Sequence, residues 1–192
     1  MAINAYARAV TDRLVSPIAR VLARIGATPN WLTFFGLVTT LAGVAIVLLG
    51  QHFVGAVVMA FGTLVDAFDG AVARERGSSG PFGEFYDSVT DRVSDGALFG
   101  AAAWLVRDDP ILFAVAMVAL SGAQVTSYIR AKAESLGWDA TVGIIERPER
   151  VMILITSIGL GFLPVALWIL AVGGVITIGQ RLVVVVRQAH TA

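Results

Sequence analysis

Residues 66–91 read DAFDGAVARERGSSGPFGEFYDSVTD, and they place four aspartates at helical spacing on both sides of a short loop rich in glycine and serine. Asp66 and Asp69 are three residues apart and Asp87 and Asp91 are four apart, so each pair shares one face of a helix. A loop this short makes the two helices antiparallel neighbours. We therefore expect the four carboxylates to converge where these helices meet.

The rest of the chain is apolar and poor in charge. Of its 192 residues, 57% are hydrophobic and 15% are charged, and the mean hydropathy is +0.80. A soluble domain usually carries about 25% charged residues, so this chain lacks the residues for a water-facing surface. A polytopic membrane protein is expected, and a soluble enzyme, a disordered protein and a nucleic-acid-binding protein are excluded. The lack of cysteine excludes disulfides and a cysteine nucleophile.

Uncharged stretches and turn residues predict an all-α fold with six transmembrane helices. The 41 residues between Arg24 and Asp66 contain no Asp, Glu, Lys or Arg, which is enough for two spans. A single membrane domain, 1–192, is expected, with spans at 30–49, 53–74, 83–105, 110–132, 147–162 and 165–187. Segment 3–25 has apolar residues at helical spacing and arginines mostly on the other side, which predicts an amphipathic helix at the membrane interface.

Basic residues predict the orientation of these spans. With six spans, all of the 14 Lys and Arg residues except Arg107 fall on one side of the membrane. The side with more Lys and Arg is the cytoplasmic one. We therefore expect a multi-pass protein of the cell membrane with its acidic cluster at the cytoplasmic surface.

Four carboxylates at the membrane surface would repel one another unless cations bind between them. Oxygen ligands select Mg²⁺, Mn²⁺ or Ca²⁺, and four carboxylates suit two divalent ions that bind a diphosphate. Gly70 leaves room for a ligand, and Arg74 can reach a phosphate oxygen. The less specific interpretation is that the acids pair with arginines of the same segment. Asp95, one turn after Asp91, is expected to pair with Arg92 or another residue, or to join the metal ligands.

The pattern D-x2-D-G-x2-A-R-x8-G-x3-D-x3-D, which starts at Asp66, resembles the signature of the CDP-alcohol phosphatidyltransferase family. Nearly the whole chain is similar to that family, because six spans after an interfacial helix also match it. The resemblance implies a homodimeric enzyme that transfers a phosphatidyl group from CDP-diacylglycerol to an alcohol and releases CMP. It also implies two Mg²⁺ ions, or Mn²⁺, as cofactors.

The resemblance also implies a role for each matching residue. The metal ligands would be Asp66, Asp69, Asp87 and Asp91, and Asp91 would also take the proton of the acceptor hydroxyl. The residues that contact the CDP-lipid would be Asn30, Trp31, Leu32, Thr33, Gly70, Arg74 and Gly80. Asn30 also fits a plain helix N-cap. Some relatives carry a hydroxyl residue at position 80, so a backbone contact or Ser79 would replace that contact here.

A second group of residues points to the acceptor. The expected acceptor-phosphate pocket is lined by Arg130, Lys132, Arg150 and Arg181. A basic pocket suits an acceptor that carries phosphate, and membrane anchoring is the alternative. Residues 127–134 and 146–150 resemble the actinobacterial phosphatidylinositol phosphate synthases of this family, which implies myo-inositol 1-phosphate as the acceptor. The closest alternative is a phosphatidylglycerophosphate synthase that uses glycerol 3-phosphate. A prenyltransferase and a divalent-cation transporter are more distant alternatives.

Overall fold

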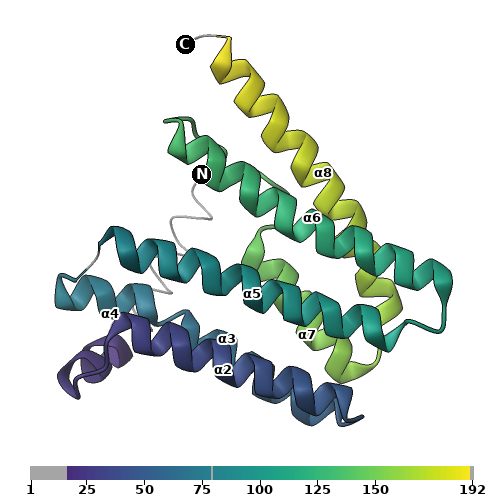
Figure 1. Cartoon of the computed structure of the whole chain (residues 1–192), viewed down its shortest axis with the longest axis horizontal. Coiled ribbons are helices and arrows are strands. Elements are labelled where there is room, and N and C mark those ends of the chain that lie inside the picture. The colour runs from purple at the N-terminus through teal and green to yellow at the C-terminus, as the bar shows by residue number, and fades with distance from the viewer. Residues whose placement is uncertain (1–16, 79, 191–192) are drawn as a thin grey trace. The chain divides into compact units, whose positions relative to one another are not determined.

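The computed structural model describes residues 17–78 and 80–190, and every regular element in this part of the chain is an α-helix (Figure 1). The helices are α2 (Pro29–Leu48), α3 (His52–Asp66), α4 (Asp69–Arg76), α5 (Pro81–Leu105), α6 (Pro110–Ser135), α7 (Arg147–Leu160) and α8 (Leu163–Ala189). Residues 17–24 are also helical, whereas most of the expected interfacial helix 3–25 lies outside the described residues. The prediction of an all-α fold is confirmed for the described part.

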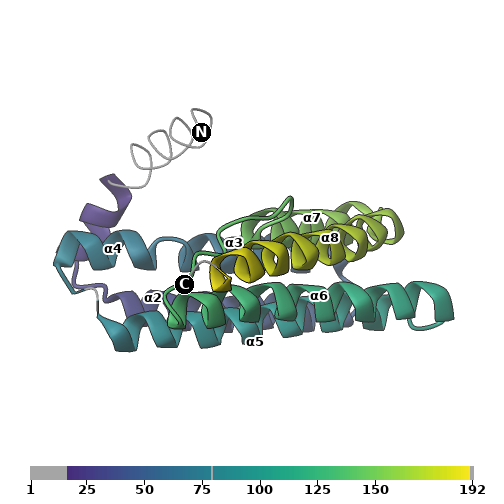
Figure 2. The same cartoon turned by 90° about the horizontal axis from the view of Figure 1, so that it is seen from above.

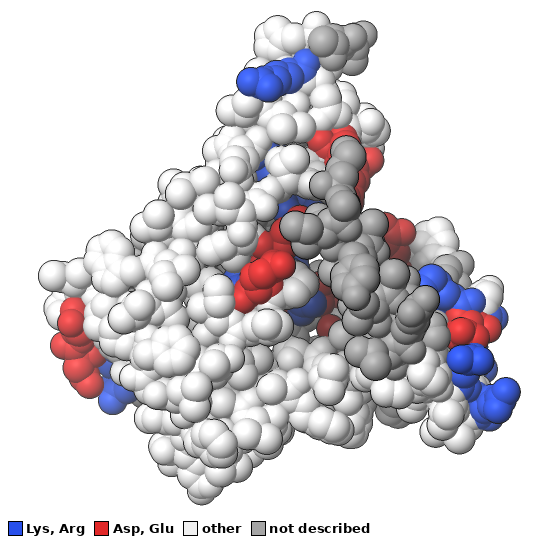
Figure 3. All heavy atoms as spheres, turned by 180° about the vertical axis from the view of Figure 1, so that it is seen from behind, with Lys and Arg blue, Asp and Glu red and all other residues white. Residues whose placement is uncertain are grey.

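Four helical segments of the described chain are long and apolar enough to cross a membrane. They are Pro29–Leu48, His52–Arg76, Pro110–Ser135 and Leu163–Ala189. Helix α5 has 25 residues but carries acids in its first half, and α7 has only 14 residues. On the face shown in Figure 3, residues other than Lys, Arg, Asp and Glu cover most of the surface. The third and fifth expected spans therefore stay a prediction.

The second candidate span contains a break that the spacing of the acids did not predict. Helix α3 ends at Asp66 and α4 begins at Asp69, with a turn at residues 67–68 between them. At this turn the N–H of Phe68 bonds to the carbonyl of Val65 at 3.1 Å, one residue closer along the chain than in an α-helix. The two acids therefore lie on opposite sides of a helix break.

The chain forms two compact units. The first comprises the described part of Met1–Ala42 together with Val58–Val93, and the second comprises Gly43–Val57 and the described part of Ser94–Ala192. The first unit contains the acidic cluster, and the second contains the predicted acceptor-phosphate residues.

In the first unit, α2 and α3 cross at two glycines. A Cβ atom on Gly36 would lie 2.9 Å from the Cβ atom of Asp66, and one on Gly62 would lie 2.5 Å from Oγ1 of Thr40. These distances are shorter than van der Waals contact, so only glycine allows this approach. The crossing sets the backbone of α2 against the turn of α3 that carries Asp66.

Replacing Gly36 by Ala should lower the free energy of unfolding by about 1–3 kcal/mol, because overpacking forces two backbones apart. The thermal unfolding midpoint in detergent measures this. Gly179→Ala is the matched control, since a Cβ atom there would meet nothing within 4 Å. An unchanged midpoint for Gly36→Ala would contradict the close crossing.

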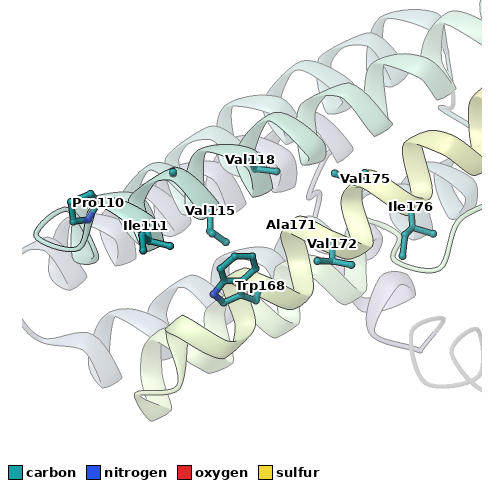
Figure 4. A pocket seen from close by; sticks show the side chains of 10 residues that line it. Pro110, Ile111, Val115, Val118, Trp168, Ala171, Val172, Val175 and Ile176 are labelled. Carbon is teal, nitrogen blue, oxygen red and sulfur yellow. The ribbon is translucent and has the colours of Figure 1, made fainter.

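In the second unit, α6 and α8 lie side by side (Figures 1 and 2). A Cβ atom on Gly122 would lie 3.5 Å from Cα of Gly174, so small residues allow the two helices to approach closely. Between the same helices, an apolar groove of about 640 Å³ runs from Pro110 past Trp168 to Ile176 (Figure 4). Such a lining is typical of a surface that faces hydrocarbon.

Candidate active site

Three of the four predicted metal-ligating acids meet in the first unit. Asp66, Asp69 and Asp87 each offer a carboxylate oxygen, and these three oxygens lie within 4.8 Å of one another. All three side chains are partly buried. Carboxylates this close repel one another unless a cation lies between them, and oxygen ligands are those that hard divalent ions prefer. The residues therefore fit a divalent metal ion.

Asp91 lies one turn after Asp87 on α5, and among the described residues it is not part of this group of three. Its side chain is 15% exposed, and its Oδ2 lies 3.7 Å from Nη2 of Arg92. A role for Asp91 in metal binding therefore stays a prediction.

The return from α4 to α5 depends on a glycine in the left-handed conformation. Gly77 has φ 59°, a value that glycine adopts without strain. The N–H groups of Gly77 and Ser78 bond to the carbonyls of Arg74 and Ala73 at 3.2 and 3.1 Å. This tight helix end starts the short return to α5, the helix that carries Asp87.

A pocket of about 420 Å³ opens beside two of the acids. Its lining residues are Pro29, Asn30, Thr33, Asp69, Gly70, Ala73, Ser78, Gly80, Pro81, Gly83, Glu84 and Asp87. A Cβ atom on Gly70 would meet nothing closer than Nη1 of Arg74 at 3.9 Å, and one on Gly80 would meet nothing within 4 Å. The two glycines therefore border open space, as expected for residues that a ligand approaches.

The predicted CDP-lipid residues divide into two groups. Asn30, Thr33, Gly70 and Gly80 line the pocket, whereas Trp31, Leu32 and Arg74 are not among its lining residues. Trp31 is 66% exposed and packs edge-on against Phe34 at 5.8 Å. Leu32 packs against a small core of Ala19, Ala71 and Val72. The pocket therefore involves only part of the predicted segment Asn30–Thr33, which lies at the start of α2.

Thr33 orients one of the acids, a contact that the sequence did not predict. Its hydroxyl donates a hydrogen bond to Oδ2 of Asp69 at 2.6 Å and lies 3.1 Å from the carbonyl oxygen of Pro29. Thr33 is 2% exposed, so water does not compete strongly for this bond. Partners of this kind fix the orientation of metal-ligating carboxylates.

Replacing Thr33 by Val should weaken the affinity for Mn²⁺ about 10- to 100-fold, because the hydroxyl that orients Asp69 is lost. Thr33→Ser keeps the hydroxyl and should bind Mn²⁺ like the parent protein. Titration calorimetry on the detergent-solubilised protein distinguishes the two variants. Equal Mn²⁺ affinities in the Val and Ser variants would show that this hydrogen bond has no role in metal binding.

Arg150 is buried in the second unit and is held by three side chains. It is 5% exposed. Its Nη2 donates to Oδ2 of Asp95 and to Oγ of Ser127, both at 2.8 Å, and its Nη1 lies 3.2 Å from Oγ1 of Thr126. The sequence predicted an acceptor-binding role for Arg150 but not these partners, because they are 23 to 55 positions away.

Arg181 is also buried, at 4% exposed. Its Nη1 donates to the carbonyl of Thr126 at 2.5 Å and its Nε to the carbonyl of Val142 at 2.8 Å. The charges of Arg130, Arg150, Glu134 and Glu146 all act on the Arg181 guanidinium. Three of the four predicted acceptor-phosphate residues are therefore near one another.

The other two residues of this basic group, Arg130 and Lys132, are exposed. Arg130 pairs with Glu134 at 2.8 Å, and both side chains are more than 40% exposed. Lys132 is exposed, and no described contact joins it to the other basic residues. The buried part of the predicted pocket therefore consists of Arg150 and Arg181.

The charged run at the start of α7 has two structural tasks. Glu146 and Glu149 form a capping box, in which the N–H of Glu146 donates to Oε2 of Glu149 at 3.0 Å. Arg147 places its Nε 3.4 Å from Oδ1 of Asp95. Two arginines of this run, Arg147 and Arg150, are therefore among the partners of Asp95.

The loop before α7 is tied to one face of α8. Thr177 accepts a hydrogen bond from the N–H of Ile145 at 3.4 Å, and Gln188 bonds to the backbone N–H and carbonyl of Asp139 at 2.9 and 2.6 Å. The hydroxyl and N–H of Thr141 both donate to the Asp139 carboxylate and lower its pKa. Together with Arg181, these bonds fasten the loop along α8.

Comparison with known proteins identifies the family of this chain. The model of the CDP-alcohol phosphatidyltransferase family matches residues 26–186. The phosphatidylinositol phosphate synthase of Mycobacterium marinum is 44% identical over 188 aligned residues, which cover 91% of this chain and 80% of the relative. The enzyme of that name from Streptomyces avermitilis is 37% identical over 207 aligned residues, which cover 99% of this chain and 85% of the relative.

Solved structures show the same likeness. The crystal structure of Mycobacterium tuberculosis phosphatidylinositol phosphate synthase with CDP-DAG bound has a TM-score of 0.82 and 41% identity, and the match covers 90% of this chain and 94% of that one. The complex of that enzyme with manganese and citrate has a TM-score of 0.81 and 41% identity, with 89% and 88% covered. The acidic cluster and the manganese complex together indicate that the site binds a divalent metal. This chain is an integral membrane enzyme that belongs to the CDP-alcohol phosphatidyltransferase family.

Proposed function

We propose that this enzyme transfers the phosphatidyl group of CDP-diacylglycerol to myo-inositol 1-phosphate, which yields phosphatidylinositol phosphate and CMP. The observation that carries the proposal is the meeting of Asp66, Asp69 and Asp87 at the edge of an open pocket. The relatives named phosphatidylinositol phosphate synthase support the choice of donor and acceptor.

The reaction forms a bond between the acceptor hydroxyl oxygen and the phosphorus that bears the diacylglycerol. The bond from that phosphorus to the oxygen of CMP breaks, and CMP leaves with the electron pair. In this proposal Asp91 takes the hydroxyl proton, the role that the family resemblance implies for the last aspartate of the motif. General-base catalysis requires a carboxylate with a pKa suited to the task.

Two Mg²⁺ ions, with Mn²⁺ as an alternative, would be held by Asp66, Asp69, Asp87 and Asp91. When bound, such ions offset the charge of the diphosphate and of the attacking and leaving oxygens. Thr33 keeps Asp69 in place by its hydrogen bond.

The CDP part of the donor would occupy the pocket next to these acids. Asn30, Gly70 and Gly80 line it and would contact the nucleotide directly. Arg74, whose Nη1 would lie 3.9 Å from a Cβ atom on the pocket residue Gly70, would pair with a phosphate oxygen. Trp31, Leu32 and Thr33 complete the proposed CDP-lipid contacts from the same segment.

The acceptor phosphate would bind to Arg130, Lys132, Arg150 and Arg181. Buried guanidinium groups need anionic partners, and Asp95 supplies one negative charge for Arg150 and Arg147 together. Two guanidinium groups therefore share one carboxylate, an arrangement that suits a phosphorylated acceptor better than a neutral alcohol.

Replacing Arg150 or Arg181 by Ala should raise the KM for the acceptor about tenfold or more, because each loss removes a charged donor to phosphate. The KM for CDP-diacylglycerol should change less. Arg107→Ala is the control, since that arginine lies over the Trp104 ring at 4.4 Å and on the other predicted side of the membrane. An unchanged acceptor KM would contradict the basic pocket.

CMP release by the purified enzyme tests the whole proposal. CDP-diacylglycerol and Mg²⁺ are supplied with myo-inositol 1-phosphate, inositol or glycerol 3-phosphate in parallel. Release with inositol phosphate alone is the expected result. Release with glycerol 3-phosphate instead would identify a phosphatidylglycerophosphate synthase. No release with any acceptor would oppose the proposal, and the distant alternative of a divalent-cation transporter would then be tested by ion flux into vesicles.

We also propose a single membrane domain with an interfacial helix at 3–25, six spans and a cytoplasmic active site in the cell membrane. Helices α5 and α7 would be the third and fifth spans. Because the chain contains no cysteine, single cysteines can be introduced and labelled from one side at a time. A cysteine at Ser78 should react only from the cytoplasmic side, and one at Asp108 only from the opposite side.

A homodimer is the proposed assembly. The small residues Ala101, Ala102 and Ala103 on α5 are at most 4% exposed within the chain, so they are occupied by contacts inside the subunit. A second copy would use other surfaces. Crosslinking in native membranes, followed by electrophoresis, checks whether the dimer forms.

A further inference from the structure

Asp95 is an acidic side chain that the reaction above does not use. It lies on α5 and has no exposed surface. Its Oδ2 accepts a hydrogen bond from Arg150 at 2.8 Å, and its Oδ1 lies 3.4 Å from Nε of Arg147. A carboxylate buried this deeply is tolerated only when it is paired with positive charge. Its two arginine partners both come from the first turn of α7.

Arg150 connects Asp95 with the other buried arginine. Its guanidinium also bonds to Ser127 and Thr126, and the carbonyl of Thr126 accepts a hydrogen bond from Arg181. A guanidinium is a rigid planar group, so an anchor at one edge fixes the direction of all its N–H bonds. Asp95 therefore sets the orientation of Arg150 within a network that reaches α6 and α8.

This arrangement satisfies only some of the N–H donors of Arg150. Its Nε is buried and has no hydrogen-bond partner in the described part of the protein. Folded proteins ordinarily avoid buried donors without partners, because each one costs free energy. The guanidinium thus takes the orientation that Asp95, Ser127 and Thr126 impose, and not the one that would satisfy its own donors.

We propose that Asp95 is a positioning residue for the acceptor phosphate. It holds Arg150 in the orientation in which the phosphate is bound, and it does not touch the acceptor itself. Its single negative charge is shared by Arg147 and Arg150, and Arg150 is linked through Thr126 to Arg181. The inference rests on the proposed function in one respect, namely that the acceptor carries a phosphate bound by this group.

The competing role for Asp95 is that of a metal ligand, because it follows Asp91 by one helical turn. Its arginine partners argue against this, since each of its carboxylate oxygens already lies at ion-pair distance from a guanidinium group, Arg147 at 3.4 Å and Arg150 at 2.8 Å. Binding of Mn²⁺ separates the two roles without reference to turnover.

The test is the Asp95→Asn variant, which keeps the shape of the side chain and removes its charge. We expect the KM for the phosphorylated acceptor to rise about 10- to 100-fold, the cost of a misplaced binding group. The KM for CDP-diacylglycerol and the affinity for Mn²⁺ should stay within about twofold of the parent values. Asp108→Asn is the matched control, because that aspartate is 89% exposed.

A double variant shows whether Asp95 acts through Arg150. If it does, adding Asp95→Asn to Arg150→Lys should change the acceptor KM little, because both substitutions disturb the same guanidinium. Ser127→Ala removes a different bond to the same Nη2 and should raise the acceptor KM by a smaller factor. This milder variant keeps the test decisive if Asp95→Asn does not fold.

Three outcomes would overturn the inference. They are an equal rise in the KM values for donor and acceptor in Asp95→Asn, additive effects on the acceptor KM in the double variant, and weaker Mn²⁺ binding by Asp95→Asn. If the enzyme uses glycerol 3-phosphate, the proposed function fails. The KM for glycerol 3-phosphate, compared between the parent protein and Asp95→Asn, then still tests the role of Asp95. If no acceptor is turned over, inorganic phosphate in the presence of EDTA provides the readout. Inorganic phosphate should raise the unfolding temperature of the parent protein and not that of Asp95→Asn. The same rise in both proteins would refute the positioning role of Asp95.

Discussion

Replacing Asp87 by Asn should reduce CMP release by more than about 1000-fold, because loss of a metal-ligating carboxylate removes several kcal/mol of charge stabilisation in the transition state. The oxygens of Asp66, Asp69 and Asp87 lie within 4.8 Å of one another, so the removal of one charge affects the whole group. Turnover and Mn²⁺ affinity should fall together in this variant. Turnover assays and titration calorimetry on the same preparation measure both.

Glu75→Gln is the control for this experiment. Glu75 lies on α4 between two arginines, is exposed and does not line the pocket. The Glu75→Gln variant should therefore release CMP at the parent rate. Retention of Mn²⁺ binding in Asp87→Asn would remove this carboxylate from the metal site, even if activity were lost.

Replacing Asp91 by Asn should lower turnover about 100- to 10,000-fold, the range that a general base contributes. Binding of CDP-diacylglycerol should stay measurable, because the group of three acids that meets the pocket does not include Asp91. Equilibrium binding of the donor lipid and single-turnover kinetics separate these two effects.

A parallel loss of donor binding and turnover in Asp91→Asn would argue for a purely metal-holding role. Asp91→Glu is the matched comparison, since it keeps a carboxylate and moves it by one methylene. If Asp91 is the base, the Glu variant should regain part of the rate that the Asn variant loses.

Local pattern was enough to predict most of the helices. The bounds of α2, α5, α6, α7 and α8 lie within three residues of the expected spans, because long uncharged runs and flanking turns depend on neighbours along the chain. The break at residues 67–68 was missed, because no glycine or proline marks it. The acidic cluster could be predicted, because a short loop forces the helices that carry Asp69 and Asp87 to be neighbours.

Contacts between distant segments could not be predicted in the same way. Thr33 and Asp69 are 36 positions apart, and Asp95 and Arg150 are 55 apart. The sequence offered a signal for only one such contact, since Gly36 and Gly43 on α2 and Gly55 and Gly62 on α3 recur at the same interval of seven. That interval is typical of a helix crossing, but it does not say which helix is the partner.

The sequence by itself determined that this chain is an all-α membrane protein and that Asp66, Asp69 and Asp87 lie close enough to fit a divalent metal ion, because helical spacing and hydropathy are local properties. Only the tertiary structure decided that Thr33 orients Asp69 and that Asp95 holds Arg150. The reason is physical: a hydroxyl or a guanidinium can bond to many acceptors, and packing of the helices selects the one that lies within about 3 Å of it.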